Sequence, residues 1–383
     1  MKPRAARCAV VALLAFPALQ PLVTQAKPTI SLVPGWGVDT SHSPEREIFR
    51  LWQGYLADRP DSIHPSAYWS AVEQAEFPEY DLLRGYVHQG YPAWTVVHLA
   101  PSPRMDSTYL IRTLVARAYD SASVVKPLAL FRVYAVREQG RWVLANALPR
   151  LTKDWKRATI GPVTFVYPGS HRFDRSRAEG SARFVDSIAA AFDVPAPRGI
   201  RYYVAANLDE MFWMMGLDFF PSGSDTAGGR SNAIDRLVFS GSASVGEAYH
   251  HELAHLVFAP LLRGRTFWLV SEGLATWAGG SAGLGFQQLL PGLARYLQLH
   301  PEVTLDGVAA DPPARAGTLD VGYDGFAVLC EMVYEKGGAS AVKALADAGT
   351  SADAVLDSAA RLLGLPRREL SAAWRRKVLA GVQ

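Results

Sequence analysis

The amino-acid sequence predicts an α+β protein with two domains, a helix-plus-meander domain and a second domain with a small mixed sheet and a helical C-terminal lobe. Three observations support this prediction. One amphipathic helical pattern precedes four strand-like runs in the first 145 residues. Short strand and helix patterns alternate between residues 163 and 239, and helical patterns dominate after residue 279. With 383 residues, of which 49% are hydrophobic and 20% charged, the chain can form two hydrophobic cores.

The first 26 residues have the pattern of a secretory signal peptide. Three basic residues lie within the first seven positions, a short apolar run covers residues 8–19, and small residues stand before residue 26. We therefore expect an exported, periplasmic or secreted protein. The apolar run is too short to span a bilayer comfortably, and no later stretch is long and apolar enough, so we expect no membrane span after signal removal.

The first domain is expected over residues 43–155, after a leader or linker at 27–42. Ser43 and Pro44 favour the start of a helix, because serine is a preferred cap and proline suits the first helical position. Strand-like runs follow at 94–99, 109–119, 128–136 and 142–144, with a turn at 138–141. We find no catalytic constellation there and interpret the segment as an accessory domain.

The second domain is expected over residues 156–383. Strands are predicted at 163–167, 200–204 and 237–239, with a helix at 182–192, a short helix opening at Asn207 and a glycine- and serine-rich loop at 221–232. Later helices are predicted at 289–299, 326–336, 341–348 and 369–379. No basic run stands out and the net charge is only +3, which gives no reason to expect nucleic-acid binding.

The motif His251-Glu252-Leu253-Ala254-His255 lies in a proline-free stretch, 245–258, that is expected to be helical. Histidines four residues apart lie on nearly one face of a helix, about 6 Å apart along its axis. Two imidazoles placed in this way can bind one zinc ion, and Glu252 can reach a water on the same ion. Cys330 would be the sole cysteine left after signal cleavage, so no intramolecular disulfide is expected.

A second segment, 267–277, reads Phe-Trp-Leu-Val-Ser-Glu-Gly-Leu-Ala-Thr-Trp and offers Glu272 as a third ligand, since catalytic zinc commonly has three protein ligands. With this segment the chain resembles the gluzincin metallopeptidases, and within them the peptidase-MA-like group with its W-L-x-E-G-L-A segment. The resemblance covers roughly residues 160–383. It implies a gluzincin-like domain in which His251, His255 and Glu272 bind one zinc ion.

The resemblance also implies roles around the metal. Glu252 matches the general base of peptide-bond hydrolysis, and Tyr323 stands where the family often has a tyrosine that stabilises the oxyanion. The strand before the metal helix commonly runs along the cleft in the family, but 237–239 can equally be an internal strand. Glu247 could orient His251 or be an exposed carboxylate. The sequence lacks the G-x-M-E-N pattern of aminopeptidase-N-like enzymes, so binding of a free amino terminus is not implied.

The sequence therefore predicts an exported zinc-dependent peptidase that acts on peptide or protein substrates. An alternative from another functional class is a non-catalytic zinc-containing protein of the envelope, used for binding or as a scaffold. A structural envelope protein without metal is a third alternative. Zinc content cannot separate the first two, whereas peptide cleavage that depends on Glu252 can.

Overall fold

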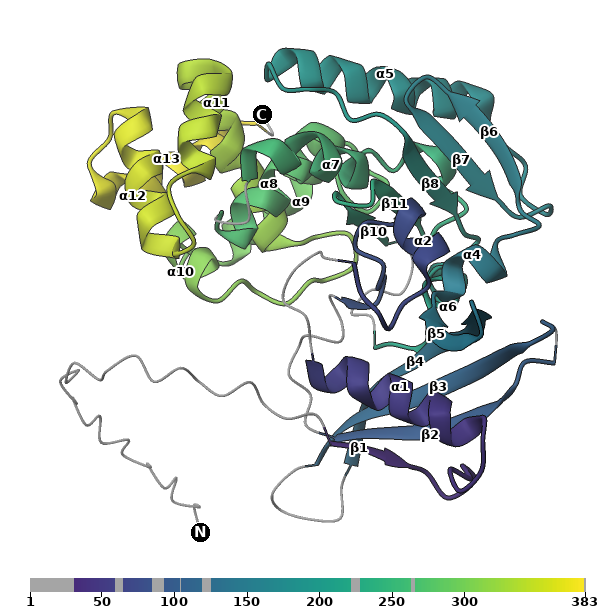
Figure 1. Cartoon of the computed structure of the whole chain (residues 1–383). Helices are drawn as coiled ribbons and strands as arrows, with labels where there is room; N and C mark the ends of the chain where they lie inside the picture. The colour runs from purple at the N-terminus through teal and green to yellow at the C-terminus, as the bar shows by residue number, and fades with distance from the viewer. Residues whose placement is uncertain are drawn as a thin grey trace, which may run out of the picture.

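The fold comes from a computed structural model, which describes residues 31–58, 65–84, 93–103, 105–118, 125–221, 228–262 and 266–381. The predicted signal peptide lies outside the described residues. The predicted fold class is confirmed, because the chain is mixed α+β with two small sheets and a helical C-terminal region (Figure 1). Among the described residues, no helix combines the length and apolar character needed to cross a membrane.

The first sheet has six strands, and α1 packs on it. Its main path runs β1 (Ser31–Pro34), β2 (Ala93–Pro101), β3 (Thr108–Ala118), β4 (Val125–Glu138) and β5 (Arg141–Ala145). Strands β2 to β5 form the expected antiparallel meander, while β1, which sequence reasoning missed, pairs in parallel with β2. The short helices α2 (Ala71–Glu76) and α4 (Ala147–Leu151) flank this unit.

Helix α1 (Glu45–Asp58) is amphipathic, as its sequence predicts. It buries Ile48, Trp52, Tyr55 and Leu56, each at most 2% exposed, and a buried side chain of this kind stabilises the fold by roughly 1.5–3 kcal/mol. The Trp52 indole donates a hydrogen bond of 3.0 Å to the Thr113 hydroxyl on β3, which leaves its buried N–H satisfied.

The second sheet has five strands in the order β10-β11-β8-β7-β6. The strands are β6 (Lys156–Ile160), β7 (Val163–Tyr167), β8 (Ile200–Val204), β10 (Gly229–Asn232) and β11 (Leu237–Ser240). The β7–β8 and β8–β11 pairs are parallel and the two outer pairs are antiparallel, so the sheet is mixed, as expected.

Both faces of this second sheet are covered. Helix α5 (Arg175–Ala191) and helix α7 (His250–Leu262) pack on one face, where Phe165, Tyr202 and Val238 are buried. The other face packs toward the first sheet and helix α6 (Leu208–Met215). Coverage on both sides accounts for the nearly continuous apolar composition of β8 and β11.

The C-terminal lobe is helical. It contains α8 (Trp268–Gly279), α9 (Phe286–Leu299), α10 (Leu305–Ala310), α11 (Val321–Ala346), α12 (Ala352–Leu363) and α13 (Arg367–Ala380). All four predicted helices are present. The two predicted at 326–336 and 341–348 share the label α11 and are separated by a kink, where Gly337 and Gly338 have non-helical backbone angles. Sequence reasoning missed α10 and α12. Cys330 is a buried free thiol.

The proposed domain boundary between residues 155 and 156 stays a prediction. One strand pairing joins the two sides of this boundary. Strand β9 (Leu217–Phe219) belongs by sequence to the second domain but pairs with β4 of the first sheet. Next to this pairing, Arg132 forms a largely buried ion pair with Asp218. The two parts of the chain therefore share a sheet and a hydrophobic core.

Candidate metal centre

Helix α7 carries the His-Glu-x-x-His motif between the second sheet and the helical lobe (Figure 1). The helix begins at His250, later than the predicted residue 245, because Gly246 adopts a positive φ of 50° within the short 3₁₀ helix Gly246–Ala248. The helix continues past the proline-free stretch to Leu262, so Pro260 lies inside its last turn. Leu253, Ala254 and Val257 are fully buried, so α7 is fixed by packing on several sides.

Helix α8 approaches both α7 and α11 closely because two of its residues are glycines. A Cβ atom on Gly279 would lie 2.5 Å from backbone atoms of His250 and His251. A Cβ atom on Gly273 would lie 2.7 Å from the Phe326 backbone of α11. Any larger residue at these positions would separate the helices, so the glycine after Glu272 holds this carboxylate between α7 and α11.

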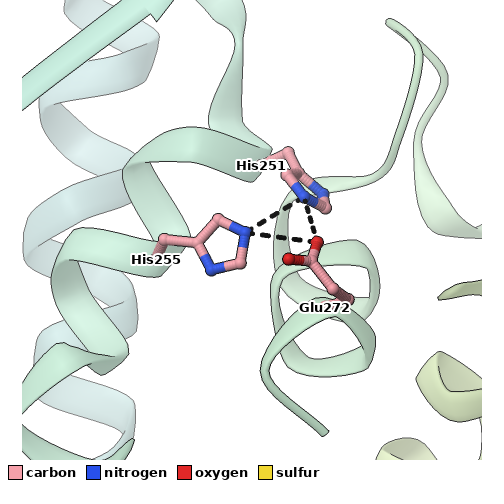
Figure 2. Close-up of side chains that lie close together, drawn as sticks. All are labelled: His251, His255 and Glu272. Carbon is pink, nitrogen blue, oxygen red and sulfur yellow. Dashed lines mark hydrogen bonds and ion pairs between the residues drawn. The ribbon is translucent and has the colours of Figure 1, made fainter. Parts of the chain in front are cut away.

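The structure brings His251, His255 and Glu272 together, and Figure 2 shows their side chains pointing toward one another from the two helices. The two Nε2 atoms lie 3.2 Å apart. Oε2 of Glu272 lies 3.2 Å from Nε2 of His251 and 3.4 Å from Nε2 of His255. Among the residues that the structure describes, these three form the one cluster whose ligand atoms could together hold a metal ion.

The spacing of these three atoms fits a zinc ion. Imidazole nitrogen and carboxylate oxygen bind zinc at about 2.0–2.2 Å in tetrahedral geometry, which places neighbouring ligand atoms roughly 3.3–3.6 Å apart. The observed separations of 3.2–3.4 Å lie at the lower edge of this range. Two imidazoles with one carboxylate are also a donor set that zinc accepts readily.

The hydrogen bond at the other side of His251 supports the same interpretation. Nδ1 of His251 lies 2.8 Å from the carbonyl oxygen of Gly280, so Nδ1 carries a proton and donates it. In the neutral ring, Nε2 then directs a lone pair at Glu272. Two lone pairs that face each other at hydrogen-bond distance call for a positive charge, which a metal ion or a second proton on the ring can supply.

The pKa shifts of His251 and Glu272 also favour a positive charge in the cluster. Burial lowers the pKa of His251, but its hydrogen bond with Glu272 and the charges of Glu252 and Glu272 outweigh burial, so the pKa is raised overall. Burial alone would raise the pKa of Glu272, yet hydrogen bonds from His251 and His255 hold it well below its ordinary value. A positive charge beside Glu272 is therefore favoured in this cluster.

Glu247 fits neither of its two alternatives, which were an orienting partner of His251 and an exposed carboxylate. Glu247 does not contact His251: its buried carboxylate bonds to His171 Nε2 at 2.7 Å and accepts from the Asp174 N–H. The Gly280 carbonyl takes the orienting role at His251, while the Ser271 hydroxyl lies 3.4 Å from Nδ1 of His255. A backbone carbonyl has no signal in the sequence, so Gly280 could not have been found there.

Two neighbours of the cluster have structural roles. His250, directly before the motif, is half-buried and stacks on the Phe184 ring, with centroids 4.6 Å apart and planes 7° apart. Thr276, four residues after Glu272 on α8, is fully buried and makes no side-chain hydrogen bond with the described residues. Neither side chain supports the cluster directly.

A cavity of about 660 Å³ opens onto the cluster. Its polar lining includes all three clustered side chains together with further groups, namely Tyr249, Glu252, Tyr323, Arg230, Arg315 and Ser271. Sequence reasoning had selected Glu252 and Tyr323 among these, and had missed Tyr249 and both arginines. Tyr249 lies two residues before the motif, and that position was the one signal that could have drawn attention to it.

Glu252 and Tyr323 both lie in this cavity. Glu252 is 7% exposed, and its Cγ would be 2.6 Å from a Cβ on Gly229, so strand β10 passes directly against it. The ring of Tyr323 is parallel to that of His251, with centroids 6.1 Å apart. Burial, and next the charge of Glu272, raises the pKa of Tyr323, so its hydroxyl stays protonated and can donate a hydrogen bond.

The edge of the second sheet reaches the cavity through β10. Its residues Gly229, Arg230 and Ser231 line the cavity, and among the described strands β10 pairs only with β11. The expected cleft strand, β11, lies instead inside the sheet between β10 and β8. The internal-strand alternative for 237–239 is therefore correct, and the loop predicted over 221–232 contains the edge strand.

No family model and no curated protein sequence matches this chain. Among solved structures, the chain is similar to the crystal structure of Legionella pneumophila aminopeptidase A in complex with aspartic acid, at 12% sequence identity and a TM-score of 0.33. The match covers 74% of this chain and 34% of that chain, so this protein spans about a third of the length of that aminopeptidase. A similarity of this degree does not establish a function.

Proposed function

We propose that this protein is an exported, zinc-dependent peptidase that hydrolyses peptide bonds with Glu252 as the general base. The observation that carries the proposal is the convergence of His251, His255 and Glu272, whose ligand atoms lie 3.2–3.4 Å apart in a cavity that Glu252 also lines. Together with the two motifs, this arrangement favours a gluzincin-like metallopeptidase of the peptidase-MA-like group.

In this proposal His251, His255 and Glu272 hold the ion. Zinc, when bound, polarises a carbonyl group and lowers the pKa of water toward about 7. The carboxylate of Glu252 accepts the proton of the attacking water and returns it to the leaving amine, which is general base and then general acid catalysis. Glu252 suits this role because it lines the cavity beside the cluster without belonging to it.

Tyr323 is proposed as the donor to the developing oxyanion. Its hydroxyl is kept protonated by burial and by the neighbouring charge of Glu272, and the residue faces the same cavity. A fixed donor of this kind is worth most when it bonds to the transition state rather than to the substrate. Tyr249, just before the first residue of α7, lines the cavity too.

The edge strand β10 is proposed to align the substrate. Its outer N–H and C=O groups have no partner strand among the described elements, and an extended peptide can add to such an edge. Gly229 lets β10 pass against Tyr249 and Glu252, so a peptide paired with this edge would run past the general base.

Two experiments separate this proposal from its alternatives. Metal analysis of the purified protein tests the metal-free structural protein, which one equivalent of zinc rules out. Cleavage of a peptide library, measured with and without a chelator, tests the non-catalytic zinc protein. We expect cleavage that the chelator abolishes and that added zinc restores. A zinc-loaded protein that cleaves no peptide would favour the binding or scaffold alternative.

Export to the periplasm or to the outside of the cell remains part of the proposal. It rests on the signal-like pattern of residues 1–26. Expression with and without this segment, followed by fractionation and sequencing of the mature N-terminus, tests it. We expect that export is lost when the segment is removed. We also expect the mature chain to start near residue 27.

A further inference from the structure

The edge strand β10 has a sequence that favours a strand only weakly. It reads Gly-Arg-Ser-Asn, without a β-branched or aromatic residue, and among the described strands it pairs only with β11. Its first residue, Gly229, nevertheless lies against the proposed general base, since a Cβ atom there would be 2.6 Å from Cγ of Glu252. The contacts at the other end of β10, at Asn232, therefore bear on the geometry of the site.

Asn232, the last residue of β10, is bound by Glu79 of the first part of the chain. Its Nδ2 donates to Oε2 of Glu79 and, at 3.1 Å, to Oδ2 of Asp235. Its Oδ1 accepts the Asp235 N–H at 2.9 Å, which closes the turn between β10 and β11. The N–H of Glu79 donates to Oδ1 of Asp235 at 2.9 Å. Glu79 thus joins this turn through both its side chain and its backbone.

The segment that carries Glu79 is itself fixed in the first hydrophobic core. Phe77 and Tyr80, on either side of Glu79, are 0% and 1% exposed. The side chain of Asn146 donates to the Tyr80 carbonyl at 2.5 Å and accepts the Leu82 N–H at 3.1 Å. Glu79 therefore lies between two anchored residues, which restricts where its carboxylate can be.

Arg201 of β8 forms a second bridge between the same two segments. Its guanidinium lies 4.1 Å from the centre of the Phe77 ring and donates to the Glu76 carboxylate. It also donates to the Glu76 carbonyl at 3.2 Å and to the Asp235 carbonyl at 3.4 Å. Because β8 pairs with β11 and β11 with β10, this bridge helps to fix β10 relative to the first part of the chain.

We propose that Glu79 is a positioning residue of the site, which holds β10 through Asn232 in the place where an extended peptide pairs. The first part of the chain thereby takes part in substrate binding. The hold on β10 does not depend on peptidase activity, whereas its effect on the substrate rests on the proposed function. Asn232 lies three residues beyond Gly229, or about 10 Å along a strand, so only a peptide of several residues reaches this end of β10.

Hydrogen exchange tests the hold on β10 without a substrate. Deuterium uptake of residues 229–240 is compared by mass spectrometry in the zinc-loaded wild type, Glu79→Ala and Glu79→Gln. We expect about tenfold faster exchange in Glu79→Ala, because a hydrogen bond to a charged group is lost. Glu79→Gln should exchange nearly as the wild type does, since its amide oxygen can still accept from Asn232. Equal uptake in Glu79→Ala and the wild type would overturn the proposal.

Peptide length tests the effect on the substrate. The best-cleaved library sequence is prepared as an octapeptide and as a tripeptide around the same bond. In Glu79→Ala the KM of the octapeptide should rise about tenfold, while zinc content and the kcat/KM of the tripeptide change less than about twofold. A merely structural loss would lower the amount of active protein and reduce kcat for both peptides alike. Equal changes for the two lengths would overturn the positioning role.

Variants of the partner show whether Glu79 acts through Asn232. Asn232→Ala should reproduce both effects, and the double variant should be no worse than the worse single variant, because the two residues share one contact. Additive effects would mean that Glu79 acts by another route, which would overturn the proposal. Glu179→Ala is the control, since Glu179 is an exposed carboxylate of α5 paired with Arg175, and it should change neither exchange nor kinetics.

Failure of the peptidase proposal gives a different result from failure of this inference. A wild type that cleaves no peptide would overturn the peptidase, whereas the exchange measurement alone decides whether Glu79 holds β10. Equilibrium dialysis of a pooled octapeptide library against the zinc-loaded wild type and Glu79→Ala then replaces the kinetics. We expect the variant to bind the library about tenfold more weakly. Equal binding would overturn the effect on the substrate.

Discussion

Oε2 of Glu272 lies 3.2 Å from Nε2 of His251, although the two residues are 21 positions apart and belong to different helices. The close contact depends on Gly273 and Gly279, which let α8 approach its neighbours. When the ring is neutral, neither of these two atoms carries a proton, because the ring proton is on Nδ1 of His251, which donates it to the Gly280 carbonyl. A cation shared by the two residues resolves this conflict, and each prediction below follows from that arrangement or from the fold that supports it.

Glu272→Ala should weaken zinc binding strongly. Removal of one of three ligands leaves two imidazoles, and we expect an affinity loss of at least about 10²-fold, since even the loss of groups that only orient ligands costs 10–100-fold. Zinc retained after dialysis against a mild chelator is the measurement. Glu302→Ala, at an exposed carboxylate paired with His300, is the control. Retention equal to that of the wild type would remove Glu272 from the ligand set.

Tyr323→Phe should lower kcat while zinc stays bound. The substitution removes the hydroxyl proposed to donate to the oxyanion and keeps the ring that packs against His251 and Trp268. Loss of one such donor costs on the order of 10² to 10³ in kcat. Steady-state kinetics on a cleaved peptide give the result. If kcat is unchanged, the donor is another group, and Tyr249→Phe is the next variant to measure.

Gly229→Ala should impair activity through the position of Glu252. The added methyl group would lie 2.4 Å from a ring carbon of Tyr249 and 2.6 Å from Cγ of Glu252, so the strand or the carboxylate must move. Small displacements of a catalytic group reduce rates strongly. Gly180→Ala in α5 is the control, because its methyl group would meet no atom within 4 Å. Kinetic measurements and zinc analysis on both variants test whether the close approach of β10 to Glu252 affects activity.

Because Asp81 is buried, the part of the protein around the first sheet should become less stable as pH rises. Burial raises its pKa from 3.8 to about 6, although hydrogen bonds from Tyr55 and Leu83 oppose this. Between those two pH values the folded chain binds more protons than the unfolded chain, so the stability that Asp81 contributes is lost as pH rises. The shift corresponds to about 3 kcal/mol.

Comparison with Asp81→Asn isolates this effect from other titrating groups. The free energy of unfolding of the wild type relative to the variant should fall between pH 4 and pH 7, measured by urea denaturation at several pH values. A difference that is constant with pH would show that Asp81 titrates alike in the folded and unfolded chain.

The sequence was informative where apolar residues repeat with the period of a helix or of a strand. It predicted the helix of α1, the meander that follows and the return of Glu272 to the two histidines. Apolar side chains at helical or alternating spacing, and ligands at positions i and i+4, carry these features directly. The fold class and the shared helix face of His251 and His255 follow from local patterns, whereas Glu272 was expected from the segment 267–277 and from the usual three protein ligands of catalytic zinc.

Other features depend on contacts between distant residues. Strand β10 reads Gly-Arg-Ser-Asn, which has no β-branched residue, and it is a strand because it pairs with β11. The pairing of β9 with β4 and the Gly280 carbonyl that orients His251 leave no trace in nearby sequence. The two arginines of the cavity look like ordinary surface charges until the fold places them beside the cluster.

One experiment tests the central claim most directly: zinc content and peptide cleavage measured side by side on the wild type and on Glu252→Gln. The carboxylate of Glu252 lines the cavity but lies outside the cluster of His251, His255 and Glu272. We predict that both proteins bind one equivalent of zinc and that the variant is slower by about 10²–10⁴-fold, the usual cost of losing a general base. Full activity of the variant, or loss of its zinc, would contradict the account.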